Sequence, residues 1–389
     1  MKVCGVIAEY DPFHRGHAWH LKEAREKSGA DYIICVMSMS FTQRGMPALL
    51  CPHDRAEMAL RCGADIVLGV PYAFSVCDAE KFAIGGVEIL RRTGVVNALS
   101  FGVEPEGMDL LLPAAEMLES PTAEFTDVLR SYMQQGLSFP HAQGKALSLV
   151  LKTNERIFSL PNTSLAVCYI RAMRKTNAQF DIFPIQRRGD YHADTLAADE
   201  QGLPSATAVR AAFMKGDMAS VQASMPKEAY QVLLRAQEQH NIQQYAPLDT
   251  LLRWRLRSDD FSQLPDLSEG LENRLKKAAN ADTRDNMVLS IKTKRYTYAR
   301  INRLLSHVLT QAKASDIAPL LDYAYLLGFK KEAASLLHVM RTGELQFYHR
   351  LPSDSLSPMQ QLDARADDLW SLGAEKPFGA LYRAQPVIL

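Results

Sequence analysis

The chain has 389 residues, of which 47% are hydrophobic and 23% charged, the composition of a folded globular protein rather than a disordered or repetitive one. Lysine plus arginine and aspartate plus glutamate each number 44, which excludes a protein that binds polyanions through its overall charge. Any contact with nucleic acid therefore has to use a local basic patch. The length exceeds that of a single ordinary core and predicts two domains.

The cysteines and the apolar segments indicate the compartment. Six cysteines are scattered without a C-x-x-C pair, so the sequence indicates neither a zinc site nor a disulfide framework, and we expect no metal-ligating residues. No uninterrupted apolar stretch of about 18 residues is present, so we expect neither secretion nor a membrane-spanning segment. A reducing cytoplasm is the expected location.

The N-terminal half alternates between strands and helices. Residues 2–8 form a continuous apolar run that predicts a strand buried on both faces, residues 17–30 follow helical spacing, and residues 31–38 predict a second strand. Helices are expected over 55–64 and 79–94, and strands over 65–72 and 97–102. This order predicts an α/β fold, a Rossmann-like nucleotidyltransferase domain with a parallel sheet.

The remaining segments divide the chain into two predicted domains. Residues 106–150 have helical character and are interpreted as an insertion, after which 178–187 predicts a strand and 204–216 a helix. Beyond residue 217 the segments have leucine and alanine faces typical of helices. We therefore predict a nucleotidyltransferase domain over 1–216 and a mostly α-helical C-terminal domain over 217–389.

The sequence His14-Arg15-Gly16-His17 stands where the first strand leads into the first helix. Open α/β sheets bind ligands beyond the carboxyl ends of their strands, and a helix N-terminus favours phosphate. Gly16 allows close approach of a nucleotide, and two histidines three residues apart can face one phosphate chain. His14 and His17 are therefore the candidate catalytic residues. The alternative is that both histidines merely cap the helix.

A second candidate phosphate site begins the predicted helix at 204–216. Ser205 is suited to capping that helix, while Thr207 and Arg210 are suited to meeting the β- and γ-phosphates. An ordinary N-cap with a solvated arginine is the alternative interpretation.

An ordered set of motifs resembles the bacterial tRNA(Met) cytidine acetate ligase family, nucleotidyltransferases with an H-x-G-H signature. The N-terminal motifs are GVIAEYDPFHRGH, MSMSFTQRGMPALL, RAEMALRCGADIVLGVPYAF, FAIGGVEILRRTG, FGVE, LPNTSLAV and SATAVR. The likeness continues through EGLENRL, IKTKRYTYARINRLL and YLLGFKKE, so it covers nearly the whole chain.

The resemblance implies an enzyme that converts acetate and ATP to acetyl-adenylate and acetylates N4 of the wobble cytidine in elongator tRNA(Met). The partners it implies are tRNA and acetate, with neither DNA nor a membrane, and magnesium would travel with the ATP. By position, it implies ATP binding by Ile7, Ala8, Glu9, Tyr10, Asp11, Pro12, Phe13, His14, Arg15, Gly16, His17, Ala18, Trp19, His20, Gly102, Asn162, Arg187, Arg188, Ser205, Thr207 and Arg210.

Six positions in four places depart from the family pattern. The chain has Met39 and Ser40 where the family usually has Gly-Asn, and Gly69 where it usually has glutamate before Leu-Pro. Cys51-Pro52 replaces Asp-Lys, and Asp11 replaces a common asparagine. These changes leave the ATP signature intact and bear on the acetate pocket or the RNA step.

A local excess of positive charge marks the candidate RNA-binding segment. Between Leu271 and Arg303 the acidic residues are Glu272, Asp282 and Asp285, whereas the basic residues are Arg274, Lys276, Lys277, Arg284, Lys292, Lys294, Arg295, Arg300 and Arg303. Tyr296 and Tyr298 offer rings on which unpaired bases can stack. We predict that Arg274, Lys276, Lys277, Lys292, Lys294, Arg295 and Arg300 bind tRNA; the alternative is a solvated basic face.

Two other functions stay possible at this stage. One is a divergent nucleotidyltransferase that acts on a small molecule or a protein-bound prosthetic group, against which the basic segment argues. The other is a non-catalytic RNA- or nucleotide-binding paralogue, suggested by Met39, Ser40 and Gly69. The intact His14, His17 and Arg210 argue against it.

Overall fold

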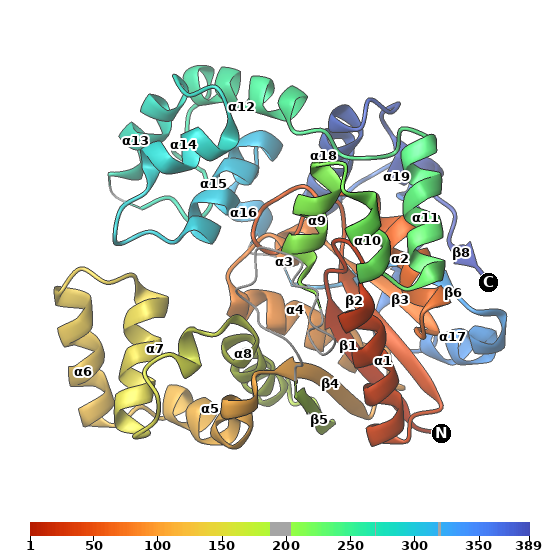
Figure 1. Ribbon diagram of the computed structural model, residues 1–389, viewed down its shortest axis with the longest axis horizontal. Helices are drawn as coiled ribbons and strands as arrows, with labels where there is room; N and C mark the ends of the chain where they lie inside the picture. Colours follow the sequence, from red (N-terminus) through yellow and green to blue (C-terminus); the bar gives the residue numbers. More distant parts are fainter. Residues whose placement is uncertain (187–203, 269, 318–319) are drawn as a thin grey trace.

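A computed structural model of the protein describes residues 1–186, 204–268, 270–317 and 320–389. Its described strands form one mixed sheet in the order β5-β4-β1-β2-β3-β6-β7, with β8 paired to β6 (Figure 1). The strands are β1 (Val3–Ala8), β2 (Tyr32–Ser38), β3 (Ile66–Val70), β4 (Ala98–Val103), β5 (Asp181–Gln186), β6 (Tyr323–Phe329), β7 (Gln346–Tyr348) and β8 (Val387–Ile388). The first five run parallel, which confirms the α/β class.

Helices cover both faces of this sheet. They are α1 (Arg15–Ser28), α2 (Pro52–Arg61), α3 (Tyr72–Ser75), α4 (Ala79–Arg92) and α8 (Pro161–Thr176). Helix α1 packs against β1, β4 and β5, and α2 packs against β3 and β6, whereas α4 packs against β1, β2 and β3 and is itself covered by α8. Strands β1 and β3 are almost completely buried, as their unbroken apolar runs require.

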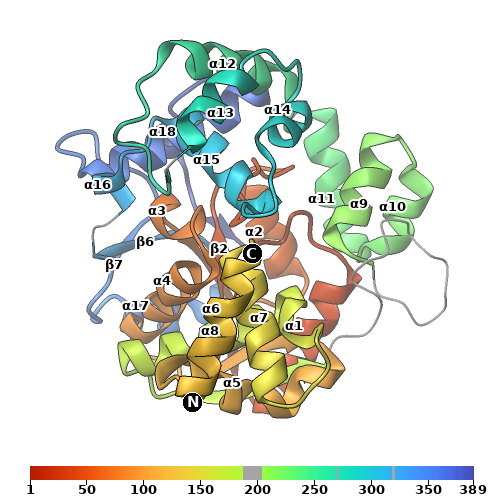
Figure 2. The same cartoon turned by 90° about the vertical axis from the view of Figure 1, so that its left-hand side faces the viewer.

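The segment predicted as a helical insertion is helical. Its α-helices are α5 (Leu111–Glu119), α6 (Ala123–Gln134) and α7 (Phe139–Val150), flanked by the 3-10 turns Pro105–Leu110 and Ile157–Ser159. Figures 1 and 2 show α6 and α7 as an antiparallel pair beside α8. The insertion thus lengthens the connection between β4 and β5 without adding a strand.

Helices dominate from residue 206 onward. They are α9 (Ala206–Met214), α10 (Met218–Ser224), α11 (Lys227–Glu238), α12 (Ala246–Ser258), α13 (Leu271–Ala278), α14 (Arg284–Ile291), α15 (Tyr298–Thr310), α16 (Ala314–Ile317), α17 (Ala334–Met340), α18 (Pro358–Gly373) and α19 (Ala380–Arg383), with a 3-10 turn at Lys331–Ala333. Helices α12 to α15 share a second hydrophobic core, into which the N-terminal half inserts Phe41, Tyr72 and Val76.

The sheet differs from the expected one at its β3 edge. We expected a parallel sheet and a mostly α-helical region beyond residue 217, without strands that join the sheet, but β6 pairs antiparallel with β3, and β7 and β8 pair with β6. The physical reason is burial: β3 is apolar on both faces, so its free edge needs a partner, which the apolar run Tyr323–Phe329 supplies. The division into domains at 216/217 stays a prediction.

Candidate nucleotide site

The turn between β1 and α1 lies at the point where the strand order reverses. The chain proceeds outward from β1 to β2 and β3, then returns to place β4 on the other side of β1. In parallel sheets the crevice beyond the carboxyl ends of two such strands is the usual ligand site. Residues 9–14, directly after β1, and Gly102, near the end of β4, both lie at this switch point of the sheet.

The two histidines of the signature stack at the start of α1. The Gly16 backbone N–H donates to His14 Nδ1 (3.0 Å), and the His14 N–H donates to His17 Nδ1 (3.2 Å). Their ring centroids are 3.7 Å apart with an interplanar angle of 24°. Capping therefore occupies Nδ1 in each ring, so each neutral imidazole carries its proton on Nε2, where it is a donor suited to phosphate oxygen.

Aromatic side chains hold this pair in place. The His17 ring packs edge-on with the Tyr10 ring (4.9 Å between centroids) and lies tilted against the Phe13 ring (5.4 Å). Tyr10 is buried, adopts a φ of 50° and shares a hydrogen bond with the thiol of Cys35 on β2 (3.4 Å). Asp11–Pro12 is a cis peptide. The turn is thus anchored to the sheet, with His14 buried and His17 half-buried.

The second candidate phosphate site, at the start of α9, contacts the turn between β1 and α1. Arg210, on α9, forms an ion pair with Asp11 (Nη1 to Oδ2, 3.2 Å) and also donates to the Asp11 backbone carbonyl. The other Asp11 oxygen accepts from the Leu49 N–H (2.7 Å). Arg210 Nη2 also donates to the exposed Thr207 hydroxyl (3.3 Å), while Ser205 caps α9 through the Ala208 N–H (3.1 Å). Two segments 199 residues apart therefore converge on one aspartate.

Predicted residues from β4 and α8 reach the same crevice. His20 Nε2 lies 3.1 Å from Ser100 Oγ on β4. Asn162, in the first turn of α8, donates through its side-chain amide to Glu104 (2.7 Å), whose other oxygen accepts from the Thr163 N–H (2.6 Å). Glu104 comes directly after β4, so it fixes Asn162 beside the strand that carries Gly102.

The other predicted ATP-binding residues are placed as follows. Ile7 and Ala8 end β1, and Ala18 and Trp19 lie half-buried in the first turns of α1, where Arg15 donates to the Met225 carbonyl (3.5 Å). Arg187 and Arg188 lie outside the described residues.

Sequence reasoning missed a buried arginine beneath the turn. Arg55, on α2, is fully buried and donates to the carbonyls of Glu9 (2.7 Å), Leu50 (3.1 Å) and Met39. It therefore ties three turns together at the carboxyl edge of the sheet. The available signal was its spacing of three and four residues from Met58 and Ala59, which places a charge on the buried face of a predicted helix.

Glu9 directly follows β1, at the same edge of the sheet as the histidine turn. The Gln43 backbone N–H donates to Glu9 Oε1 (2.5 Å). Burial raises the pKa of the Glu9 carboxyl, while the positive charges of Arg44 and Arg210 act in the opposite direction. Asp11 differs from Glu9 because its two oxygens already accept from Leu49 and Arg210.

The basic segment divides into surface residues and buried ones. Arg274, Lys276, Lys277, Lys294 and Arg295 are exposed, and Lys292 and Arg300 are half-buried. Lys292 lies over the ring of Tyr298 (5.0 Å) and Arg300 over that of Tyr296 (5.3 Å). Arg284 and Arg303, which also contributed to the predicted charge excess, are buried.

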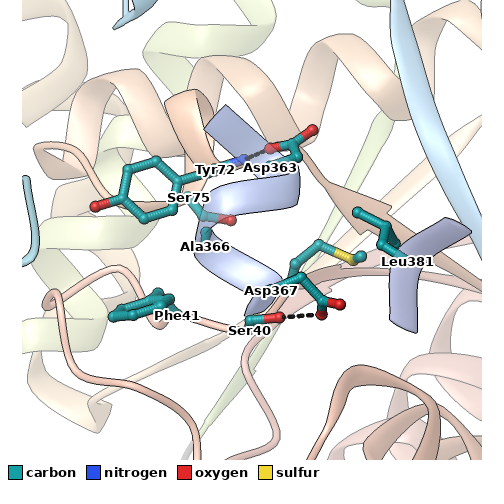
Figure 3. A pocket seen from close by; sticks show the side chains of 9 residues that line it. Ser40, Phe41, Tyr72, Ser75, Asp363, Ala366, Asp367 and Leu381 are labelled. Carbon is teal, nitrogen blue, oxygen red and sulfur yellow. Dashed lines mark hydrogen bonds between the residues drawn. The ribbon is translucent and has the colours of Figure 1, made fainter. Parts of the chain in front are cut away.

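Of the departures from the family pattern, Met39 and Ser40 line a pocket under α18 (Figure 3), and Gly69 lies behind Met39. Met39 fills the space beside Gly69, where a Cβ would overlap its sulfur. The Ser40 hydroxyl donates to Asp367 (2.8 Å), and the Tyr72 N–H donates to Asp363 (2.7 Å). The carboxylates of Asp363 and Asp367 would repel the acetate anion. This pocket is therefore unsuited to binding acetate.

The described part of the chain contains neither a membrane-spanning helix nor a metal-binding cluster. None of its helices combines the length and the apolar character that crossing a membrane requires. Within the same residues, no cluster of three or more histidine, cysteine, aspartate or glutamate side chains is arranged to hold a metal ion.

Comparisons with known proteins identify the family of the chain. The family model for HIGH nucleotidyl transferases matches residues 1–381. The chain is 31% identical over 410 aligned residues to the tRNA(Met) cytidine acetate ligase of Clostridium perfringens SM101, covering 100% of both chains. It is 32% identical to the enzyme of that name from Clostridium tetani, covering 96% of each.

Solved structures match over the full length. Thermotoga maritima TmcAL bound with alpha-thio ATP superposes with a TM-score of 0.87 at 29% identity, covering 100% of both chains. Its apo form superposes with a TM-score of 0.89 at 30% identity, with the same coverage. The chain belongs to the HIGH nucleotidyl transferases and, within them, to the tRNA(Met) cytidine acetate ligase family of enzymes.

Proposed function

We propose that this enzyme joins acetate to ATP as acetyl-adenylate and transfers the acetyl group to N4 of the wobble cytidine of elongator tRNA(Met). The names of its relatives and the ATP analogue bound to Thermotoga maritima TmcAL support this substrate set. The observation that carries the proposal is the convergence of His14, His17 and Arg210 on one turn at the strand-order reversal.

In the first step, an acetate oxygen attacks the α-phosphorus of ATP and pyrophosphate leaves. Such in-line displacement needs alignment and stabilisation of charge on the phosphate oxygens rather than covalent help from the protein. His14 and His17 serve as Nε2–H donors to those oxygens. Ser205, Thr207 and Arg210 face the β- and γ-phosphates, with Arg210 held by Asp11. Magnesium, where present, arrives with the nucleotide.

In the second step, the N4 amine of the cytidine attacks the acetyl carbonyl, a C–N bond forms, AMP leaves with the electrons of the broken C–O bond, and the amine loses one proton to solvent. The mixed anhydride is already reactive, so positioning of the base dominates. The cytidine has to leave the anticodon stack to reach the crevice. The exposed Arg274, Lys276, Lys277, Lys294 and Arg295, with Lys292 and Arg300, form the tRNA-binding surface of a domain spanning 217–389.

One assay tests this function against its alternatives. The purified chain is incubated with ATP and labelled acetate, with and without tRNA(Met), and the digested tRNA is analysed by mass spectrometry for N4-acetylcytidine. We expect acetyl-adenylate in both samples and N4-acetylcytidine only with tRNA. Acetyl-adenylate without modified tRNA would instead support a small-molecule substrate. Nucleotide binding without acetyl-adenylate would support a non-catalytic paralogue.

A further inference from the structure

The turn over residues 41–47 joins the nucleotide crevice to the helical region. We name it the coupling turn; Phe41 and Pro47 form an antiparallel bridge at its base. Within it, the Thr42 N–H donates to the Met46 carbonyl (2.8 Å) and the Gly45 N–H donates to the Thr42 carbonyl (2.9 Å). These bonds close a tight reversal whose two sides contact different parts of the protein.

One side of the coupling turn contacts the crevice. The Gln43 backbone N–H donates to the Glu9 carboxylate (2.5 Å), and the Gln43 side-chain amide donates to the Cys77 carbonyl (2.6 Å). Glu9 directly follows β1, and Cys77 lies between α3 and α4. Gln43 is therefore fixed to the same edge of the sheet that carries the histidine pair.

The other side is held by α14 and α15. The Gly45 carbonyl accepts hydrogen bonds from Arg284 Nη2 (2.8 Å) and from the Ser306 hydroxyl. Gly45 has a φ of +83°, and a Cβ there would lie 2.6 Å from the backbone N and Cα of Arg303. This position therefore requires glycine for two reasons: its left-handed conformation and its close contact with the α15 backbone.

Arg284 explains why part of the basic segment is buried. Besides Gly45, its guanidinium donates to the side chain (3.1 Å) and carbonyl (2.6 Å) of Asn302 on α15. Its charge thus fastens the coupling turn to α14 and α15, the two helices between which the exposed Lys294 and Arg295 lie. Both α14 and α15 are consequently linked to Glu9 through three consecutive residues, Gln43 to Gly45.

We propose that the coupling turn is a positioning element that holds the RNA-facing helices in register with the nucleotide crevice, and so governs acetyl transfer but not adenylate formation. This inference rests on the proposed function. Adenylate formation uses two small substrates, both within the crevice. Acetyl transfer also requires a base whose tRNA is held by the helical region, so only that step depends on the distance between the two. A misplacement of about 1 Å can cost roughly 100-fold in rate.

The test compares Gly45→Ala with a matched variant, Gly136→Ala. Gly136 joins α6 to α7 and has the same φ of +83°, but nothing lies within 4 Å of the position of its added Cβ. Gly136→Ala therefore reproduces the backbone strain without the contact on α15. For both variants we would measure acetate-dependent ATP–pyrophosphate exchange without tRNA, kcat and KM for tRNA acetylation, tRNA Kd, and thermal unfolding.

We expect Gly45→Ala to lower kcat for acetylation about 10- to 100-fold relative to Gly136→Ala, with exchange and tRNA Kd within threefold. An equal fall in both reactions, or no difference between the variants, would overturn the proposal. If Gly45→Ala does not fold, Ser306→Ala replaces it, because this change removes one donor to the Gly45 carbonyl without adding bulk. The same comparison of kcat for acetylation with ATP–pyrophosphate exchange then applies, and we expect acetylation to fall about threefold or more relative to exchange. Failure of the wild type to make N4-acetylcytidine would refute the proposed function itself.

Discussion

The carboxyl edge of the sheet has two halves, and a helix covers only one of them. Over β1 and β4, the side chains of Glu9, His17, His20 and Asn162 are half-buried and polar. Over β2 and β3, α18 closes the edge, and every departure from the family pattern that we identified there is buried, including Met39 at 7% exposure. The two halves are adjacent, but only the first presents groups suited to phosphate. The departures at 39, 40 and 69 thus concern packing beneath α18 rather than nucleotide chemistry.

The most damaging change to the first half is His17→Ala. We expect acetyl-adenylate formation to fall at least 100-fold, because a donor to the phosphate oxygens is lost. Loss of the Nδ1 acceptor for the His14 N–H should lower the free energy of unfolding by only about 1 kcal/mol. ATP–pyrophosphate exchange and urea denaturation measure the two effects. The exposed His338, changed to alanine, is the control. Retained exchange in His17→Ala would remove this histidine from the mechanism.

The second half should respond to pH. Burial raises the pKa of Asp367 to about 6, against a hydrogen bond from Ser40 that lowers it. The unfolded chain therefore loses its proton first as pH rises from about 4 to 6, and the free energy of unfolding falls by roughly 3 kcal/mol over that range. Burial also raises the pKa of Asp363 to about 6, so that carboxyl adds a loss of its own over the same range. Asp367→Asn should remove only the part due to Asp367, giving a more stable protein at pH 7.5 and no change at pH 3.5.

Denaturation of Asp367→Asn at several pH values measures this effect. The exposed Asp354, changed to asparagine, is the control. Equal pH dependence in the wild type and in Asp367→Asn would contradict the role of this carboxyl.

A smaller effect is expected where two departures meet. Gly69→Ala forces a Cβ against the Met39 sulfur and should destabilise the protein by about 1–3 kcal/mol. In Met39→Ala the same change at position 69 should cost less, with a coupling energy of about 1–2 kcal/mol in the double-mutant cycle. ATP–pyrophosphate exchange should stay within twofold throughout. Additive stabilities, or a selective loss of exchange, would show that the two halves are not separable in this way.

The smallest effect concerns charges outside both halves. Replacing Lys294 and Arg295 by glutamine should weaken tRNA binding by up to about tenfold and reduce the slope of log K against log salt by roughly one to two. Nucleotide binding should not change. The matched double control replaces Lys331 and Arg341 by glutamine. Both residues are exposed, and both follow α15 in the sequence, outside the basic segment. Unchanged tRNA affinity and salt slope would reject the predicted surface.

Local sequence patterns predicted the helices and strands of the N-terminal half of the chain well. The apolar run at 2–8 is β1 (Val3–Ala8), and the helix expected at 79–94 is α4 (Ala79–Arg92), because burial on both faces and helical periodicity leave direct traces in sequence. Strand β6 escaped prediction because its apolar run follows a long helical stretch, and only the edge of β3, more than 250 residues earlier, explains it.

The candidate site could be predicted in its residues but not in its contacts. The histidine pair follows from strand–turn–helix order, whereas the Arg210–Asp11 ion pair joins segments 199 residues apart. Charge counting also overestimated the exposed basic surface, because the sequence does not show that Arg284 donates to Gly45 and Asn302 and is buried. Contacts between distant segments and the burial of charged groups decide these two features. Neither produces a periodic pattern in the sequence.

Strand β6 is synthesised long after β3, the strand whose edge it covers, and this order affects folding during translation. Until Tyr323–Phe329 leaves the ribosome, β3 presents an unpaired apolar edge, a template for association between nascent chains. Cooperative folding of the N-terminal sheet therefore has to wait for most of translation. A chain terminated shortly before residue 323 would carry the whole histidine turn and still be prone to aggregate.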